Sequence, residues 1–212
     1  KDPRHCLART VLGIHGRDGA HAEFLSLPTE NLIPVPDTVS DEQAVFIEPL
    51  AAAYGIYEQV PLAHHTRVAI IGDGKLGLLT ALSYGATSSN ALLVGKHKEK
   101  LAIAEAAGVA TCLLSELDTS AQRTFDVVVE ASGSESGFAT ALDLVRPRGN
   151  IVLKSTFSGE PKWAASRVVV DEITIVGSRC GRFEPALKLL ERGKLDLSPM
   201  ISDEFRLADG IA

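Results

Sequence analysis

Residues 67–77 run Arg67-Val68-Ala69-Ile70-Ile71-Gly72-Asp73-Gly74-Lys75-Leu76-Gly77, and this stretch decides the fold that we expect. A continuous apolar run enters the motif G-x-G-x-x-G, and leucines at helical spacing follow it. A strand, a tight turn and a helix N-terminus in this order are typical of a site that holds a dinucleotide pyrophosphate. In such a turn Gly72 allows the bend, Gly74 lets the backbone approach the phosphates, and Gly77 lets helix and strand pack closely. We therefore predict a cofactor site at Gly72, Gly74, Lys75, Leu76 and Gly77.

Composition narrows the class of protein. The chain has 212 residues, a net charge of −6 and 45% hydrophobic residues, which is ordinary for a globular protein. No apolar run approaches the roughly 18 residues of a membrane span, and no basic stripe indicates a nucleic-acid partner. Three widely spaced cysteines, Cys6, Cys112 and Cys180, predict no disulfide framework and favour the reducing cytoplasm. We expect a cytoplasmic protein whose partner is a small molecule.

Strand and helix patterns alternate from Arg67 onward. The strand runs are continuously apolar, as in Val127–Val129, which is typical of a parallel sheet covered by helices on both faces. Gly108 and Gly193 stand where helix C-caps belong. This alternation predicts an α/β fold with a doubly wound parallel sheet. We place strands near 67–71, 90–94, 111–114, 125–131, 150–155 and 172–177, and helices near 75–85, 97–107, 135–146 and 183–192.

The first 40 residues have a different pattern. Short β-like runs at Thr10–Ile14 and Ala22–Leu27 lie between glycines and prolines, as in the end of a mostly-β unit. Ser40, with a glutamine three residues later, predicts a capping box and a helix. We expect this helix to break at Glu48, because Pro49 disfavours helical geometry in the residue before it. Pro49 would then open a second helix.

The second predicted strand bears on the choice of cofactor. In folds of this kind an acidic residue at the end of that strand, about 20 residues past the glycines, binds the ribose hydroxyls of NAD. Here the strand ends at Gly95 and is followed by Lys96, His97 and Lys98, so that no carboxylate stands at this position. A 2′-phosphate would meet two cations and an imidazole there in place of a repelling charge, and an anion gains charge-assisted bonds from such groups. We therefore predict a preference for NADP over NAD; the alternative is that the lysines are only the solvated start of a helix.

The order of several segments resembles the zinc-dependent medium-chain alcohol dehydrogenases. The resemblance covers essentially the whole chain. The segments are G-R-D-G-A-H-A-E-F (Gly16–Phe24), E-P-L-A (Glu48–Ala51), the glycine turn, E-A-S-G (Glu130–Gly133), R-P-R-G-N-I-V-L (Arg146–Leu153) and G-S-R-C-G (Gly177–Gly181).

The resemblance implies a domain organisation. Residues 1–48 would be the C-terminal part of a GroES-like catalytic domain, 49–179 a Rossmann-type NAD(P)-binding domain, and 180–212 the return to the catalytic domain. Family members carry roughly a further third of the protein upstream of Lys1 and a short tail beyond Ala212, so the resemblance implies an incomplete chain. It also implies a homo-oligomer formed through edge strands near 172–177.

The chemistry implied by the resemblance is hydride transfer between an alcohol, polyol or sugar and NADP or NAD. A zinc ion would act as the Lewis acid and keep one position open for substrate. Glu48, just before the P-L-A run, resembles a catalytic zinc ligand, and Cys6 resembles the last cysteine of a structural zinc lobe. Their partner ligands would lie before Lys1. Alternatively, Glu48 caps the following helix and Cys6 is a small isolated thiol.

Further residues follow from position in the fold and from the family. Ser132 comes at the end of a predicted strand, where ligands bind in open α/β sheets. Leu76 occupies a position that in the family packs behind the nicotinamide ring. Cys112 and Cys180 are interpreted as structural.

Two other functions stay open. The first is a zinc-independent reductase of the same superfamily, resembling quinone reductases; the Glu48-Pro49 and His5-Cys6 pairs favour the zinc-dependent form instead. The second is a dinucleotide-binding module without catalysis. No nucleophile elbow or paired-carboxylate pattern indicates a hydrolase.

Overall fold

The chain is described by a computed structural model that covers residues 3–60, 62–87, 90–156 and 164–210. It divides into two compact units, one formed by Lys1–Val35 with Ile201–Ala212 and the other by Pro36–Met200. The larger unit contains the sheet and the predicted cofactor turn. The expected domain boundaries, 48/49 and 179/180, stay a prediction based on the family.

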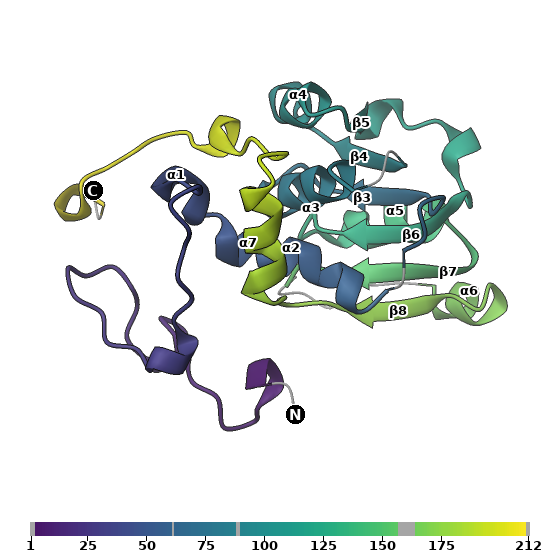
Figure 1. The fold of residues 1–212 in the computed structure, drawn as a ribbon. Helices are drawn as coiled ribbons and strands as arrows, with labels where there is room; N and C mark the ends of the chain where they lie inside the picture. Colours follow the sequence, from purple (N-terminus) through teal and green to yellow (C-terminus); the bar gives the residue numbers. More distant parts are fainter. Residues whose placement is uncertain (1–2, 61, 88–89, 157–163, 211–212) are drawn as a thin grey trace. The chain divides into compact units, whose positions relative to one another are not determined.

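A six-stranded parallel sheet forms the centre of the larger unit (Figure 1). Its order is β5-β4-β3-β6-β7-β8, so the chain first builds outward on one side of β3 and then on the other. This order creates a switch point between β3 and β6, where ligands bind in doubly wound sheets. The strands are β3 (Val68–Ile71), β4 (Ala91–Gly95), β5 (Ala110–Leu113), β6 (Phe125–Glu130), β7 (Val145–Leu153) and β8 (Thr174–Gly177). The predicted fold class is confirmed.

Helices cover both faces of the sheet. Along β3, Val68 and Ile70 pack in the core that includes Leu78 of α3, whereas Ala69 and Ile71 pack in the core that includes Phe138 of α5. Burial of alternate residues on opposite faces explains why this strand is apolar throughout. The helices are α1 (Asp41–Ala44), α2 (Ile47–Tyr54), α3 (Lys75–Gly85), α4 (Lys98–Ala106), α5 (Glu135–Leu144), α6 (Ala165–Val170) and α7 (Phe183–Glu191).

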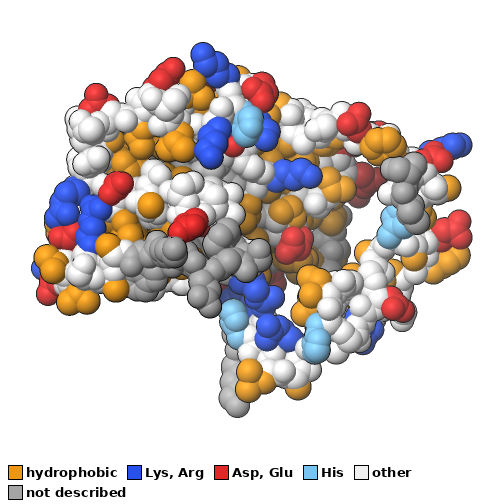
Figure 2. Space-filling model, turned by 180° about the vertical axis from the view of Figure 1, so that it is seen from behind, with side chains coloured by type: hydrophobic (Ala, Val, Ile, Leu, Met, Phe, Trp, Pro, Cys, Tyr) orange, Lys and Arg blue, Asp and Glu red, His pale blue; other side chains and the backbone are white. Residues whose placement is uncertain are grey.

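A third core joins three helices on one side of the sheet. Leu50 of α2, Leu79 of α3 and Leu190 of α7 are all buried in it, and Figure 1 shows the three helices together. Helix α7 therefore packs against α2, although the two helices are far apart in the sequence. On the face presented in Figure 2, Lys and Arg side chains are interspersed with Asp and Glu.

Helix ends follow the local signals with one correction. Ser40 and Gln43 form the predicted capping box at the start of α1, and Gly108 and Gly193 have the left-handed φ of helix C-caps, +81° and +62°. The predicted break at Glu48 is wrong, because the chain leaves the helix at residues 45–46 and α2 begins at Ile47. A proline in the first turn of a helix loses no hydrogen bond, since N–H groups there have no partner within the helix.

Two further boundaries differ from the prediction. The helix expected over 135–146 ends at Leu144, and β7 begins at Val145, five residues before the predicted start of that strand. The register between β6 and β7 shifts between Phe125 and Val127, which accommodates the early start. Among the described residues of the smaller unit, the strands are β1 (Val11–Leu12) and β2 (Gly16–Arg17), which pair with each other, and the run Ala22–Leu27 forms no strand. None of the described helices is long and apolar enough to cross a membrane.

Candidate cofactor-binding site

The glycine turn between β3 and α3 has the geometry that its sequence predicts. Gly72 has φ +111°, a conformation that L side chains rarely adopt. A Cβ at Gly77 would lie 1.9 Å from the carbonyl oxygen of Gly72, so only glycine lets the helix start this close to the turn. Gly74 is the N-cap of α3, and a Cβ there would meet nothing within 4 Å. The space above Gly74 leaves the backbone N–H groups of the first helical turn open to a ligand.

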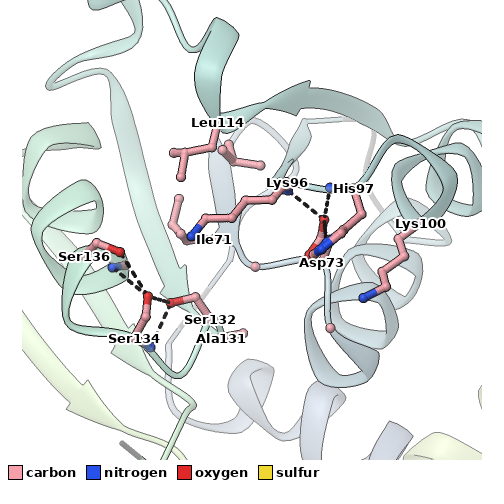
Figure 3. Close-up of a pocket in the computed structure, with 15 residues that line it drawn as sticks. Ile71, Asp73, Lys96, His97, Lys100, Leu114, Ala131, Ser132, Ser134 and Ser136 are labelled. Atoms are coloured by element: carbon pink, nitrogen blue, oxygen red, sulfur yellow. Dashed lines mark hydrogen bonds and ion pairs between the residues drawn. The ribbon is translucent and has the colours of Figure 1, made fainter. Parts of the chain in front are cut away.

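A cavity of about 300 Å³ lies beside this turn at the carboxyl ends of β3, β4 and β6 (Figure 3). It is at the switch point of the sheet, where a dinucleotide site is expected. Six of the residues predicted to bind the cofactor line it: Gly72, Gly74, Gly95, Lys96, His97 and Ser132. Lys75, Leu76 and Gly77 do not line it and form the start of α3 instead.

Asp73 gives the cavity an acid at the end of β4. Its Oδ2 atom accepts hydrogen bonds from the backbone N–H groups of Lys96 and His97, both at 2.7 Å, and its carboxylate lies 3.1 Å from Nδ1 of His97. Burial raises the pKa of Asp73, but the hydrogen bonds from His97 and Lys96 outweigh it and leave the pKa lowered. The carboxylate is therefore ionised at neutral pH.

This contact corrects one premise of the sequence interpretation. Residues 95–98, at the end of β4 and directly after it, include no carboxylate, yet the side chain of Asp73 brings one to this position from the glycine turn. The acid was missed because position 73 is the variable residue of G-x-G-x-x-G. A signal was available, since a glycine at position 95 leaves room that a neighbouring side chain can fill.

Cations surround the same end of the cavity. Lys96 and His97 are exposed, Lys100 is half-buried, and all three line the cavity. In Figure 3 the side chains of Lys96 and Lys100 lie on either side of Asp73. The predicted residues Lys96 and His97 therefore lie beside a buried acid.

The opposite wall is built on Glu130, the last residue of β6. Its Oε1 atom accepts hydrogen bonds from the backbone N–H of Ser132 at 2.8 Å and from the Ser132 hydroxyl at 2.5 Å. The hydroxyl of Ser155, which follows β7, donates to Oε2. Ser132 also contacts the hydroxyl of Ser134, the N-cap of α5, at 2.9 Å. Glu130 therefore fixes the predicted residue Ser132 although it does not line the cavity itself.

A buried lysine lies at the end of β7. Lys154 is 5% exposed and donates from Nζ to Ser178 Oγ at 3.2 Å and to the carbonyl oxygen of Arg179 at 3.1 Å. Burial lowers the pKa of Lys154 to about 8, and the nearby charges of Cys180 and Glu48 act in the opposite direction. No sequence pattern predicts a role for this lysine, because a single lysine after a strand is not distinctive.

The predicted metal ligands are not gathered into a metal site. Glu48 is exposed in the first turn of α2, and Cys6 is an exposed thiol in the smaller unit. Among the residues that the structure describes, no three His, Cys, Asp or Glu side chains form a group that could hold a metal ion. Because a catalytic zinc requires several protein ligands, the described residues do not by themselves fit one.

Comparison with known proteins agrees with this geometry. Residues 74–192 match the family model described as zinc-binding dehydrogenase. The chain is 26% identical to the sorbitol dehydrogenase of Halalkalibacterium halodurans over 220 residues, which cover 96% of this chain and 63% of that protein. The chain therefore spans less than two thirds of the length of this curated relative.

Two solved structures share the fold. A structure described as a short-chain alcohol dehydrogenase, RspB of Escherichia coli CFT073, in complex with NADH, matches with a TM-score of 0.87 at 23% identity, covering 97% of this chain and 65% of that one. A putative zinc-binding dehydrogenase of Sinorhizobium meliloti 1021, bound to NADP, matches with a TM-score of 0.80 at 25% identity, covering 90% and 60%.

Proposed function

Because the chain belongs to the zinc-binding dehydrogenase family, we propose that it serves hydride transfer between an alcohol, polyol or sugar and a nicotinamide dinucleotide. The observation that carries this proposal is the cavity of about 300 Å³ at the switch point, built on the Gly72–Gly77 turn. The name of the sorbitol dehydrogenase relative supports a polyol or sugar substrate. The chain spans 63% of the length of that relative, so the dehydrogenase activity of the whole protein is proposed from the family.

The proposed placement of the cofactor follows from the turn. The pyrophosphate would bind the N–H groups at the start of α3, where no side chain caps the helix. The adenosine ribose would lie between Asp73 and the cations of Lys96 and Lys100. Ser132 would contact the cofactor from the opposite wall, and Leu76, half-buried in the first turn of α3, would pack behind the nicotinamide ring.

The preference for NADP is kept as a proposal. Lys96 and Lys100 supply positive charge on the cavity wall, and the Sinorhizobium meliloti relative is bound to NADP. Measured dissociation constants for both dinucleotides test it. Tighter binding of NAD than of NADP would contradict this preference.

Zinc enters only as a proposed ligand assignment. We propose that Glu48 binds the catalytic zinc and Cys6 a structural zinc, as the family resemblance implies. The zinc content of the purified protein and of its Glu48→Gln and Glu42→Gln variants tests the first assignment. Loss of zinc in Glu48→Gln alone supports it, and equal zinc in all three proteins contradicts it.

A second candidate function is a dinucleotide-binding module without catalysis, which the cavity at the switch point could also serve. The two functions are separated by one assay, the reduction of NADP in the presence of a panel of alcohols and polyols. Substrate-dependent formation of reduced nicotinamide supports the dehydrogenase. Dinucleotide binding with no such reduction supports the binding module.

Two properties of the assembly complete the proposal. We propose a homo-oligomer that pairs through β8, because this strand is at the edge of the sheet. We also propose a cytoplasmic location, which the three widely spaced cysteines favour. Light scattering of the purified protein tests the first property.

A further inference from the structure

The side chain of Asp73 fills the volume that a side chain at Gly95 would need. A Cβ atom at Gly95 would lie 2.6 Å from both Cβ and Oδ2 of Asp73, closer than real Cβ contacts allow. Gly95 ends β4, the strand after which an NAD site ordinarily carries its ribose-binding acid. The missing side chain at position 95 thus makes room for a carboxylate that arrives from the glycine turn.

The carboxylate of Asp73 is held rigidly in that room. It accepts two backbone hydrogen bonds at 2.7 Å from Lys96 and His97, and only 7% of the residue is exposed. It nevertheless lines the cavity, and Figure 3 shows it next to Lys96 and His97. A fixed, ionised acid on the wall of a dinucleotide cavity can accept hydrogen bonds from ribose hydroxyls.

We infer that Asp73 influences the cofactor selectivity of this site: the glycine turn supplies the carboxylate that β4 lacks, and this carboxylate accepts from the ribose hydroxyls and weakens the preference for NADP that Lys96 and Lys100 favour. The inference rests on the proposed dinucleotide function. It assigns to the variable position of the glycine motif a role that is ordinarily carried by another strand.

The hydrogen-bond donors around Asp73 explain why this carboxylate weakens the binding of a 2′-phosphate in particular. The backbone N–H groups of Lys96 and His97, just before α4, are the natural anion donors at this end of the cavity, and Asp73 already uses both. A 2′-phosphate is left with the side chains of Lys96, Lys100 and His97 and must approach a like charge. NADP affinity therefore reflects these cations working against Asp73, whereas NAD meets no such opposition.

The first experiment removes the charge and keeps the shape. Asparagine at position 73 retains an oxygen that can accept from the two backbone N–H groups. Dissociation constants for NAD and NADP are measured by isothermal titration for the wild type and for Asp73→Asn. The expected result is a fall in the ratio of the NADP constant to the NAD constant by about tenfold. If both constants change by the same factor, Asp73 is only a structural clamp and the inference is overturned.

Asp196 provides a matched control. Its carboxylate also accepts from a backbone N–H, that of Ser198 at 3.0 Å, and it does not line the cofactor cavity. Asp196→Asn is expected to leave the ratio of the two constants unchanged. A shift in Asp196→Asn equal to that in Asp73→Asn would overturn the inference, because it would show a general effect of lost charge.

The second experiment moves the acid back to β4. Gly95→Asp alone forces two side chains into one space and is expected to lower the melting temperature. Asp73→Gly combined with Gly95→Asp is expected to recover the melting temperature and to hold the wild-type ratio, whereas Asp73→Gly alone lowers the ratio. A double variant with the ratio of Asp73→Gly overturns the inference.

The outcomes also separate this inference from the proposed function. A wild-type protein that binds neither dinucleotide contradicts both. Binding of both dinucleotides by the wild type, with an unchanged ratio in Asp73→Asn, contradicts the inference and leaves the proposed function in place.

Discussion

The carboxylate of Asp73 lies 2.7 Å from the backbone nitrogen of His97, a residue 24 positions further along the chain. This contact ties the turn after β3 to the segment between β4 and α4. Both segments follow the carboxyl ends of neighbouring parallel strands, so the sheet itself brings them together. The adenosine end of the proposed cofactor site therefore depends on two loops that are fixed to each other.

Because α3 begins so close to the glycine turn, we expect one added methyl group at Gly77 to lower the stability of the protein strongly. A Cβ at Gly77 would lie 1.9 Å from the Gly72 carbonyl oxygen, which is backbone and cannot rotate away. Gly77→Ala is expected to lower the free energy of unfolding by about 2 kcal/mol or more, measured by urea denaturation. The matched variant is Gly74→Ala, whose Cβ meets nothing within 4 Å and is expected to cost less than about 1 kcal/mol. Equal losses in the two variants would argue against this packing.

Glu130 is expected to support the cavity wall through its hydrogen bonds. Glu130→Ala leaves the backbone N–H and hydroxyl of Ser132 without their acceptor, so dinucleotide affinity is expected to fall by about tenfold. Glu130→Gln keeps an acceptor oxygen and is expected to retain most of the affinity. Titration of NADP into both variants checks this, and wild-type affinity in Glu130→Ala would be the contrary result.

Lys154 predicts a rise in stability at alkaline pH. Its pKa is about 8 in the folded chain, against an ordinary 10.5. Between these two values the unfolded chain binds a proton that the folded chain does not, so the free energy of unfolding increases with pH. Below about pH 8 both states carry the proton, and the cost of burying the ammonium is fully present.

The measurement compares the wild type with Lys154→Met from neutral to strongly alkaline pH. The wild type is expected to gain on the order of 1–3 kcal/mol relative to the variant across the window. Using the difference between the two proteins cancels the other groups that titrate there. Parallel stability curves would show that burial of Lys154 does not shift its pKa as described.

Most of the fold was predictable because its elements carry strong local patterns. The strands β3 and β6 are apolar on both faces, and α3 follows a glycine turn whose geometry few other sequences can adopt. The break at residues 45–46 was misplaced by giving Pro49 a helix-breaking role that it lacks in a first turn. The start of β7 at Val145 depends on its register with β6, which no local pattern encodes.

Only those residues of the candidate site that belong to a local sequence pattern could be predicted from the sequence. Gly72, Gly74 and Gly95 were found because they lie in or directly after strands. Asp73 was passed over because its partners are more than 20 residues away, and Lys154 because its burial depends on Ser178 and Arg179 of a later segment. Long-range contacts of this kind come from the order of strands in the sheet.

The central claim, that the Gly72–Gly77 turn binds a dinucleotide, is tested most directly by adding a negative charge at Gly74. A Cβ atom added at Gly74 or at Gly177 would meet nothing within 4 Å. Of these two glycines, Gly74 lines the cavity and Gly177 does not. Isothermal titration of NADP and NAD is performed on the wild type, Gly74→Asp and Gly177→Asp. We predict that Gly177→Asp binds like the wild type and that Gly74→Asp loses about tenfold or more in affinity for both dinucleotides. Undiminished binding by Gly74→Asp would contradict the claim.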